Sequence, residues 1–269
     1  MDARPVIHHS PFGTEGIKES KNDLAKYQRE GKISKETYQK LLRFIDEIYN
    51  TPHPLSLNDY VDQITITNYW MFKKLFEKFN KSKPNLIFLS QEKVVLDLIM
   101  DHHISNKTTI HRILFNQKYH ELLEKHLEGV TGAFYKEKGL GTFLFWGLPK
   151  DSKYRIQLWR NGNKLESKDK TYSVELTPEA IKEAIQKKEL IPSVMLTFFV
   201  FSLYYGLILG GGYEQTYYLT QTKNNYLKLL AEAGDQESID ACEGLVTRNL
   251  VIPRPLLTYL EAPGDLRIP

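Results

Sequence analysis

Residues 190–213 form the longest stretch of the chain without a charged side chain, and most of them are apolar. About 20 apolar residues in a row can cross a bilayer as a helix, so a membrane span is one interpretation. Hydroxyl-bearing residues interrupt the stretch, however, and Tyr204 and Tyr205 lie within it, whereas membrane proteins concentrate tyrosine at the two interfaces. Helices that are apolar on every side also occur at the centre of large globular domains. We therefore expect a buried helix that begins near Pro192, and a membrane segment is the alternative.

The composition is that of a globular protein rather than a disordered one, with 41% hydrophobic and 26% charged residues among 269. The formal net charge of +3 is too small to indicate nucleic-acid binding. Cys242 is the only cysteine, which excludes a disulfide within the chain, and its acidic neighbours disfavour a reactive thiolate. Residues 1–13 contain no apolar signal core. We expect a cytoplasmic protein without a membrane or nucleic-acid partner.

The sequence pattern changes near residue 130. Before this point apolar residues recur at helical spacing, and after it come short aromatic and β-branched runs separated by glycine or charged turns. We predict an α+β fold, mostly helical, with a small antiparallel sheet over about residues 130–176 that packs against C-terminal helices. The predicted organisation is a flexible arm over 1–13, a helical region over 14–129, a sheet with helices over 130–262 that packs with that region as one globular unit, and a tail over 263–269.

Local signals predict individual elements. The pair Asn161-Gly162 predicts the two-residue turn of a hairpin. Thr177-Pro178 predicts the start of a helix, because threonine caps a helix and proline suits its first turn. Residues 86–89 are a short apolar run, which we interpret as a strand.

Three consecutive glycines, Gly210, Gly211 and Gly212, follow the apolar stretch and precede a predicted helix. A glycine-rich loop ahead of a helix is a common phosphate site. Here Glu214 occupies the place where the anion would lie, and the lysine and hydroxyl spacing of a phosphate loop is missing. Two interpretations stay open: the glycines end the buried helix, or they form a wall where the backbone approaches a ligand.

Tyrosines and polar side chains surround the glycine triplet and predict a small-molecule pocket between the sheet and the helices of 190–230. Glu214, if removed from water, would act as a general base in this pocket. We expect an intracellular enzyme that acts on a small molecule, with a biosynthetic transferase as one candidate, and the sequence specifies no cofactor. The predicted ligand-binding residues are Gly210, Gly211, Gly212, Tyr205, Tyr213, Gln215, Tyr217, Tyr218, Arg155 and Arg160.

Asp101-His102-His103 follows an apolar segment and resembles the metal-binding signature of the DHH phosphoesterases. Carboxylate and imidazole groups suit manganese or a similar divalent ion, so the resemblance implies a divalent-metal-dependent hydrolase as an alternative function. The aspartate-rich motifs of that family are missing from the N-terminal region of this chain. The polar end of a helix is the other interpretation of these three residues, and we assign no metal site to them.

The segment 69–83 interleaves lysines with aromatic residues. Such a segment either contacts an acidic partner or buries its aromatic stripe while its lysines stay in water. A second alternative function is therefore a non-catalytic interaction module that docks a partner through this helix, or a homodimer.

Gly139 and Gly141 form a GxG pair, but the third glycine of the dinucleotide-binding fingerprint is missing and strand-like residues follow. These departures exclude a Rossmann-type nucleotide site at this point.

Overall fold

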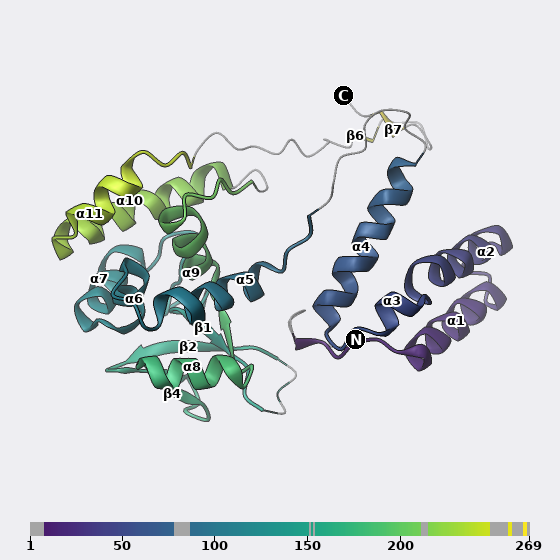
Figure 1. Ribbon diagram of the computed structural model, residues 1–269, viewed down its shortest axis with the longest axis horizontal. Coiled ribbons are helices and arrows are strands. Elements are labelled where there is room, and N and C mark those ends of the chain that lie inside the picture. The colour runs from purple at the N-terminus through teal and green to yellow at the C-terminus, as the bar shows by residue number, and fades with distance from the viewer. Residues whose placement is uncertain are drawn as a thin grey trace. The chain divides into compact units, whose positions relative to one another are not determined.

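The computed structural model describes residues 8–77, 87–150, 152, 154–210, 215–247, 258–259 and 266–267, and the structural statements below concern these residues. The chain divides into two compact units, Met1–Val94 and Val95–Pro269 (Figure 1). The boundary falls inside the region 14–129, which the sequence pattern presents as one helical region. The packing of the whole chain as one globular unit stays a prediction.

The first unit is helical. Its elements are α1 (Thr14–Arg29), α2 (Lys35–Phe44), the π-helical segment η2 (Ile45–Tyr49), α3 (Pro52–Leu55) and α4 (Tyr60–Phe76), and α5 (Gln91–Leu98) crosses the boundary. Ser34 and Asp59 cap α2 and α4, because their side chains accept hydrogen bonds from free backbone N–H groups. Residues 87–90 form no strand, so the strand predicted over 86–89 is wrong for its described part.

The buried side chain of Gln63 ties the chain ahead of α1 to α4. It accepts a hydrogen bond from Phe12 N at 2.8 Å and donates to Phe12 O at 2.9 Å and to Pro54 O at 3.0 Å. These bonds satisfy the amide, which would otherwise lower the stability of the unit. Phe12 is thus fixed at α4, while the flexibility of the arm over 1–13 stays a prediction.

The second unit contains a five-stranded antiparallel sheet in the order β4-β3-β2-β1-β5. Helix α8 (Pro178–Gln186) packs against β4 and β5 (Figure 1). The predicted α+β class is confirmed, and the sheet extends past residue 176 because the start of the apolar stretch supplies its edge strand. The strands are β1 (Phe145–Gly147), β2 (Ile156–Asn161), β3 (Lys164–Ser167), β4 (Ser173–Glu175) and β5 (Leu190–Pro192).

Strands β2 and β3 form the predicted hairpin, with its turn one residue later than expected. Asn161 pairs with Lys164, so Gly162 and Asn163 are the two turn residues. Gly162 has a φ of 61°, a left-handed conformation that glycine adopts without steric cost. A glycine with positive φ at the first turn position is typical of two-residue hairpins.

The other helices of the second unit gather around α10, which packs against both α7 and α11. Thr177 caps α8 through a hydrogen bond from Ala180 N, as its sequence predicts. The remaining elements are η3 (Ile99–His103), α6 (Thr109–Phe115), α7 (Gln117–Leu127), α9 (Val194–Phe198), η4 (Phe199–Tyr204), α10 (Gln215–Ala233), α11 (Gln236–Glu243), and the pair β6 (Thr258–Tyr259) and β7 (Leu266–Arg267).

The uncharged stretch forms a buried helix, but a shorter one than its length suggests. Pro192 does not begin this helix; it ends β5, where it pairs with Phe145 of β1. Ser193 then caps α9 by accepting a hydrogen bond from Leu196 N at 3.1 Å. Met195 and Phe199 are fully buried, which confirms the predicted apolar helix in the core. Among the described residues, no helix has the length and apolar character that crossing a membrane requires.

Candidate functional site

A cavity of about 490 Å³ lies in the second unit between the loop 129–142, strand β1 and the start of α9. We call it the loop cavity. Its walls are mainly aromatic and aliphatic, including Phe134 of the loop, Trp146 of β1 and Val194 of α9. Volumes of roughly 300–1,000 Å³ with mostly apolar walls are typical of small-molecule sites.

Hydrogen bonds hold the loop of this cavity in one conformation. Gln157 of β2 donates from Nε2 to the carbonyl oxygens of Gly139 at 2.6 Å and Gly141 at 2.8 Å. Within the loop, Gly129 N donates to Phe134 O at 2.8 Å. The cavity therefore has a fixed backbone wall rather than one that forms only when a ligand arrives.

Two glycines of the loop leave no room for a side chain. Gly132 has a φ of 86°, and a Cβ there would lie 2.9 Å from Cδ2 of Tyr218. Gly141 has a φ of 69°, and its Cβ would lie 2.5 Å from the carbonyl oxygen of Ala133. Both positions need glycine, because left-handed backbone and close contact each disfavour a larger residue.

Few polar groups line the loop cavity. Ser193 is buried, and its hydroxyl oxygen accepts the cap hydrogen bond while no described residue accepts its proton. Lys138 lies at the exposed rim with its ammonium group 4.7 Å above the ring of Tyr135. Thr131 and Tyr135 also belong to the lining, so a ligand in this cavity meets mostly apolar walls, a few hydroxyl groups and one positive charge.

Two of the sequence-predicted ligand residues contact residues that line the loop cavity. Tyr218 packs on Gly132 and stacks on Phe198 with ring centroids 5.5 Å apart. Arg155 lies over the ring of Trp146 at 4.3 Å. Neither residue lines the loop cavity itself, so a ligand-binding role for Tyr218 and Arg155 stays a prediction.

The other described members of that set lie elsewhere. Arg160 forms an ion pair with Glu124 at 2.5 Å, and the hydroxyl of Tyr217 accepts a hydrogen bond from Gln221 at 2.6 Å. Gly210 is exposed in an irregular segment, and Gln215 is the first residue of α10. The proposed base Glu214, together with Gly211, Gly212 and Tyr213, lies outside the described residues, so its role stays a prediction.

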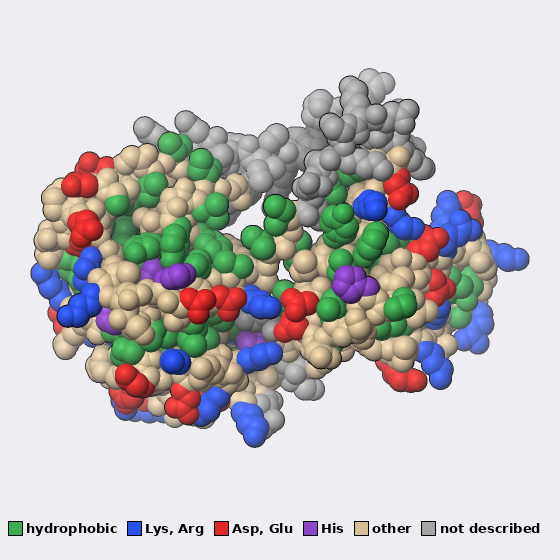
Figure 2. All heavy atoms as spheres, viewed as in Figure 1, with side chains coloured by type: hydrophobic (Ala, Val, Ile, Leu, Met, Phe, Trp, Pro, Cys, Tyr) green, Lys and Arg blue, Asp and Glu red, His purple; other side chains and the backbone are tan. Residues whose placement is uncertain are grey.

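Tyr205 lies at a surface instead. Figure 2 shows apolar side chains gathered on one face of the second unit. The large apolar side chains exposed at the end of η4 are Tyr204, Tyr205, Leu207 and Ile208. The Tyr205 hydroxyl is hydrogen-bonded to Nε2 of His103 at 3.3 Å, so this tyrosine contacts the buried histidine and not the loop cavity.

The residues 101–103 that resemble a metal signature differ in their surroundings. Asp101 and His102 are exposed, whereas His103 is fully buried and uses both ring nitrogens, Nδ1 with Thr108 Oγ1 at 2.9 Å and Nε2 with Tyr205. In the described part of the chain, no three His, Cys, Asp or Glu side chains are placed to share a metal ion. The metal-dependent hydrolase stays a prediction that these contacts do not support.

Burial gives His103 a measurable role in acid stability. Burial, followed by the nearby His102 and His111, lowers the pKa of His103 from 6.5 to about 4. The unfolded chain takes up this proton near pH 6.5 and the folded chain near pH 4, so stability falls as the pH drops through this window. We expect the unfolding temperature of His103→Gln to fall less between about pH 7 and pH 4.5 than that of the unmodified protein. Equal falls in the unfolding temperature of His103→Gln and of the unmodified protein over this range would contradict the prediction.

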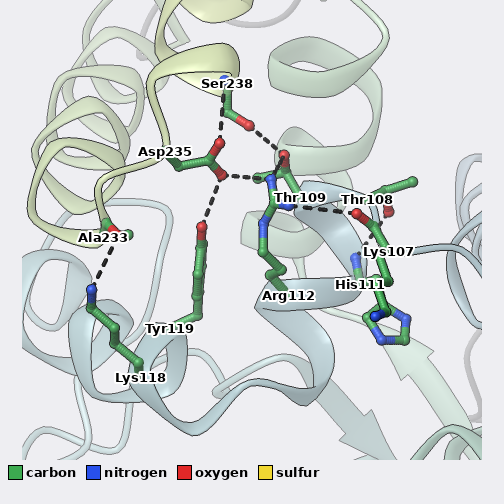
Figure 3. Close-up of polar contacts among 10 residues, drawn as sticks. All are labelled: Lys107, Thr108, Thr109, His111, Arg112, Lys118, Tyr119, Ala233, Asp235 and Ser238. Atoms are coloured by element: carbon green, nitrogen blue, oxygen red, sulfur yellow. Dashed lines mark hydrogen bonds and ion pairs between the residues drawn. The ribbon is translucent and has the colours of Figure 1, made fainter.

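A second polar site joins three helices around Asp235, which caps α11. Figure 3 shows Arg112 of α6 and Tyr119 of α7 converging on its carboxylate. Arg112 Nη2 donates to Asp235 Oδ2 at 2.7 Å, and the Tyr119 hydroxyl donates to the same oxygen at 2.8 Å. Burial opposes ionisation of Asp235, but the bonds from Tyr119 and Ser238 and the charge of Arg112 outweigh it and lower the pKa. The carboxylate is therefore ionised at neutral pH and holds the three helices together.

Next to this network lies a cavity of about 450 Å³, which we call the helical cavity. Its lining includes Lys107, Thr108 and Arg112 at the start of α6, Tyr204 of η4, Tyr226 of α10 and Glu237 of α11. Sequence reasoning missed it, because Arg112 and Asp235 are 123 residues apart and no local pattern links them.

Cys242 of α11 is buried, and burial raises the pKa of its thiol to about 11. The thiol is therefore protonated and unreactive at neutral pH, in agreement with its sequence context.

In the first unit, the described part of the segment 69–83 shows a partly exposed aromatic surface. Tyr69 and Trp70 of α4 are each 38% exposed, and the ammonium of Lys73 lies 5.2 Å from the centroid of the Trp70 ring. Phe72 and Phe76 pack against each other at 4.5 Å. A partner for this surface, and the homodimer, stay predictions.

Comparisons with known proteins find no matching family model, no matching curated protein and no matching solved structure. The loop cavity and the helical cavity, both formed by described residues, are the features that bear on the function of this chain.

Proposed function

We propose that the chain binds a small, mostly apolar molecule that carries a hydrogen-bond acceptor or an anionic group, and that it does so in the loop cavity. One observation carries this proposal: the buried hydroxyl of Ser193 has a proton that no described residue accepts, and it lies in the wall of an otherwise apolar cavity of about 490 Å³. A pocket with apolar walls and a few placed polar groups is the usual form of a small-molecule site.

The chemistry of the walls limits the ligand. Phe134 and Trp146 offer aromatic surfaces that favour a flat ring. Lys138 at the rim attracts a negative charge, since no described carboxylate pairs with it. An aromatic or aliphatic body with a sulfonate, carboxylate or carbonyl group fits these three features.

Enzymatic activity, with a transferase as one candidate, is a further step that stays a prediction. The proposed base Glu214 lies outside the described residues, and the polar side chains that line the loop cavity are hydroxyl groups and Lys138, with no carboxylate or imidazole among them. Binding of a small molecule is the function that the geometry supports best. The cytoplasmic location of the protein also stays a prediction.

Binding in the loop cavity can be tested with the fluorescent probe 8-anilino-1-naphthalenesulfonate, which has an aromatic body and a sulfonate. We expect saturable binding of one probe per chain, and we expect Val194→Trp to weaken it about tenfold because the larger side chain fills the cavity. Fluorescence titration gives the dissociation constants.

The chain offers a matched control for this substitution. Val194 is 55% exposed and lines the cavity, whereas Val246 is 53% exposed and lies away from it. Val246→Trp should leave the dissociation constant unchanged. Equal weakening by both variants would show that the probe binds exposed apolar surface rather than the loop cavity.

A further inference from the structure

The helical cavity contains polar groups that the protein leaves without partners. Tyr226 is 2% exposed and its ring stacks on Phe199 with centroids 4.9 Å apart, yet its hydroxyl makes no hydrogen bond to a described residue. Arg112 Nε is also buried without a partner among the described residues. A buried polar group without a partner lowers stability, and the Tyr226 hydroxyl adds a donor with no acceptor among the described residues at the same cavity.

Both unpartnered groups are hydrogen-bond donors at neutral pH. The Arg112 guanidinium is always protonated. Its Nη2 donates to Asp235, which fixes the position of the group, whereas Nε–H donates to no described residue. Burial, followed by nearby Cys242 and Asp235, raises the pKa of Tyr226 well above its usual value of 10, so its hydroxyl keeps its proton. The cavity is thus lined by one hydroxyl donor that lacks an acceptor in the described part of the chain, and by a guanidinium that Asp235 holds in place.

Positive charge at the entrance points to the same kind of ligand. Lys107 is exposed, lines the cavity and forms no ion pair with a residue in the described ranges. Glu237 lines the cavity as well and would repel a group with two negative charges more than a group with one. Leu203 and Ala241 supply an apolar wall for the body of a ligand.

We propose that the helical cavity is an oxyanion site that binds the carboxylate or phosphate group of a small molecule through the Tyr226 hydroxyl and the Lys107 ammonium, beside the positive charge of the Arg112 guanidinium. Charged acceptors form the strongest hydrogen bonds with such donors. This site shares no lining residue with the loop cavity, so it goes beyond the function proposed above and can be tested separately from it.

Three probes with one phenyl body separate the possible ligands. Isothermal titration of the full chain with benzoate, phenyl phosphate and the neutral benzamide should show saturable binding of an anion and binding of benzamide that is weaker by about tenfold or more. We expect benzoate to bind more tightly than phenyl phosphate because of Glu237, and Glu237→Gln should tighten phenyl phosphate more than benzoate. The reverse order of affinity would assign the site to phosphate rather than carboxylate.

Tyr226→Phe is the decisive variant because it removes only the unpartnered hydroxyl. We expect it to weaken benzoate binding about tenfold and to leave the unfolding temperature unchanged, since the hydroxyl makes no hydrogen bond to a described residue that the substitution would break. Benzoate also fits the ligand class proposed for the loop cavity, so the comparison is repeated in a Val194→Trp background, where that cavity is filled, and Tyr226→Phe should weaken benzoate binding there by the same factor.

Several results would overturn the oxyanion site. These are the absence of saturable binding for both anions, equal affinity for benzoate and benzamide, or a Tyr226→Phe variant that unfolds at a lower temperature while binding benzoate normally. The last result would mean that the hydroxyl stabilises the fold and has no ligand to hold. Loss of probe binding in Val194→Trp has no bearing on this outcome, because Val194 lies outside the helical cavity.

Discussion

Asp235→Ala is expected to lower the free energy of unfolding of the second unit by about 3 kcal/mol, at the low end of the range for a broken buried ion pair. The Asp235 side chain is only 9% exposed, and its loss leaves the Arg112 charge and the Tyr119 hydroxyl without their acceptor. It also removes the cap of α11, which adds to the loss. Arg112 is 32% exposed, so water partly compensates and keeps the effect from being larger.

Urea unfolding followed by tryptophan fluorescence measures this effect. Trp146 and Trp159 report on the second unit, and a Trp70→Phe background removes the signal of the first unit. Asp240→Ala is the matched control on the same helix, because Asp240 is exposed and accepts a hydrogen bond from Gln236 alone among the described residues. A similar small loss in both variants would mean that the network does not hold the helices together.

The same variant has a defined pH dependence. The pKa of Asp235 is lowered in the folded state, so its contribution to stability is complete above the unfolded pKa of about 4 and is lost as the pH falls through the folded pKa. The stability difference between the unmodified protein and Asp235→Ala should therefore shrink below about pH 4.

Gly141→Ala is expected to lower the free energy of unfolding by about 3 kcal/mol and to abolish probe binding in the loop cavity. A left-handed conformation costs alanine about 1–2 kcal/mol, and crowding costs about 1–3 kcal/mol more. The crowding is specific, because the added Cβ would lie 2.5 Å from the carbonyl oxygen of Ala133 in the backbone of the same loop. The loop must shift, and the cavity wall shifts with it.

The hairpin glycine separates these two contributions. Gly162 has a φ of 61°, and a Cβ added there would meet no atom within 4 Å. Gly162→Ala should therefore cost only the conformational part, about 1 kcal/mol. Urea unfolding of both variants gives the difference, and probe titration shows whether the cavity survives. An equal loss of unfolding free energy in the two variants would indicate that the backbone around Gly141 shifts to accept a Cβ atom, despite the hydrogen bonds of the loop.

The helices and the fold class follow from local signals in the sequence. Thr177 caps α8 as its sequence predicts, and the change of pattern near residue 130 separates α7 from the part of the chain that forms the sheet, whose first strand β1 begins at Phe145. The start of the buried helix could not be predicted in this way. Pro192 suits the first turn of a helix, but its pairing with Phe145, a contact between distant parts of the chain, places it in a strand.

The candidate sites depend even more on distant contacts. The glycine triplet stands out locally, yet the described glycine wall belongs to the loop of Gly132 and Gly141. Closely spaced glycines are visible in the sequence of this loop, but only the contacts with Tyr218 and Ala133 explain why they must be glycine. No local pattern could indicate that Tyr226 would be buried beside Arg112 with its hydroxyl unpartnered among the described residues.

A crystal structure of the full chain with saturating 8-anilino-1-naphthalenesulfonate tests the central claim most directly. The account predicts density for one probe in the loop cavity, with its rings against Phe134 and Trp146 and an acceptor within hydrogen-bond distance of Ser193 Oγ. Density for the probe only at other surfaces, with the loop cavity free of it, would contradict the account.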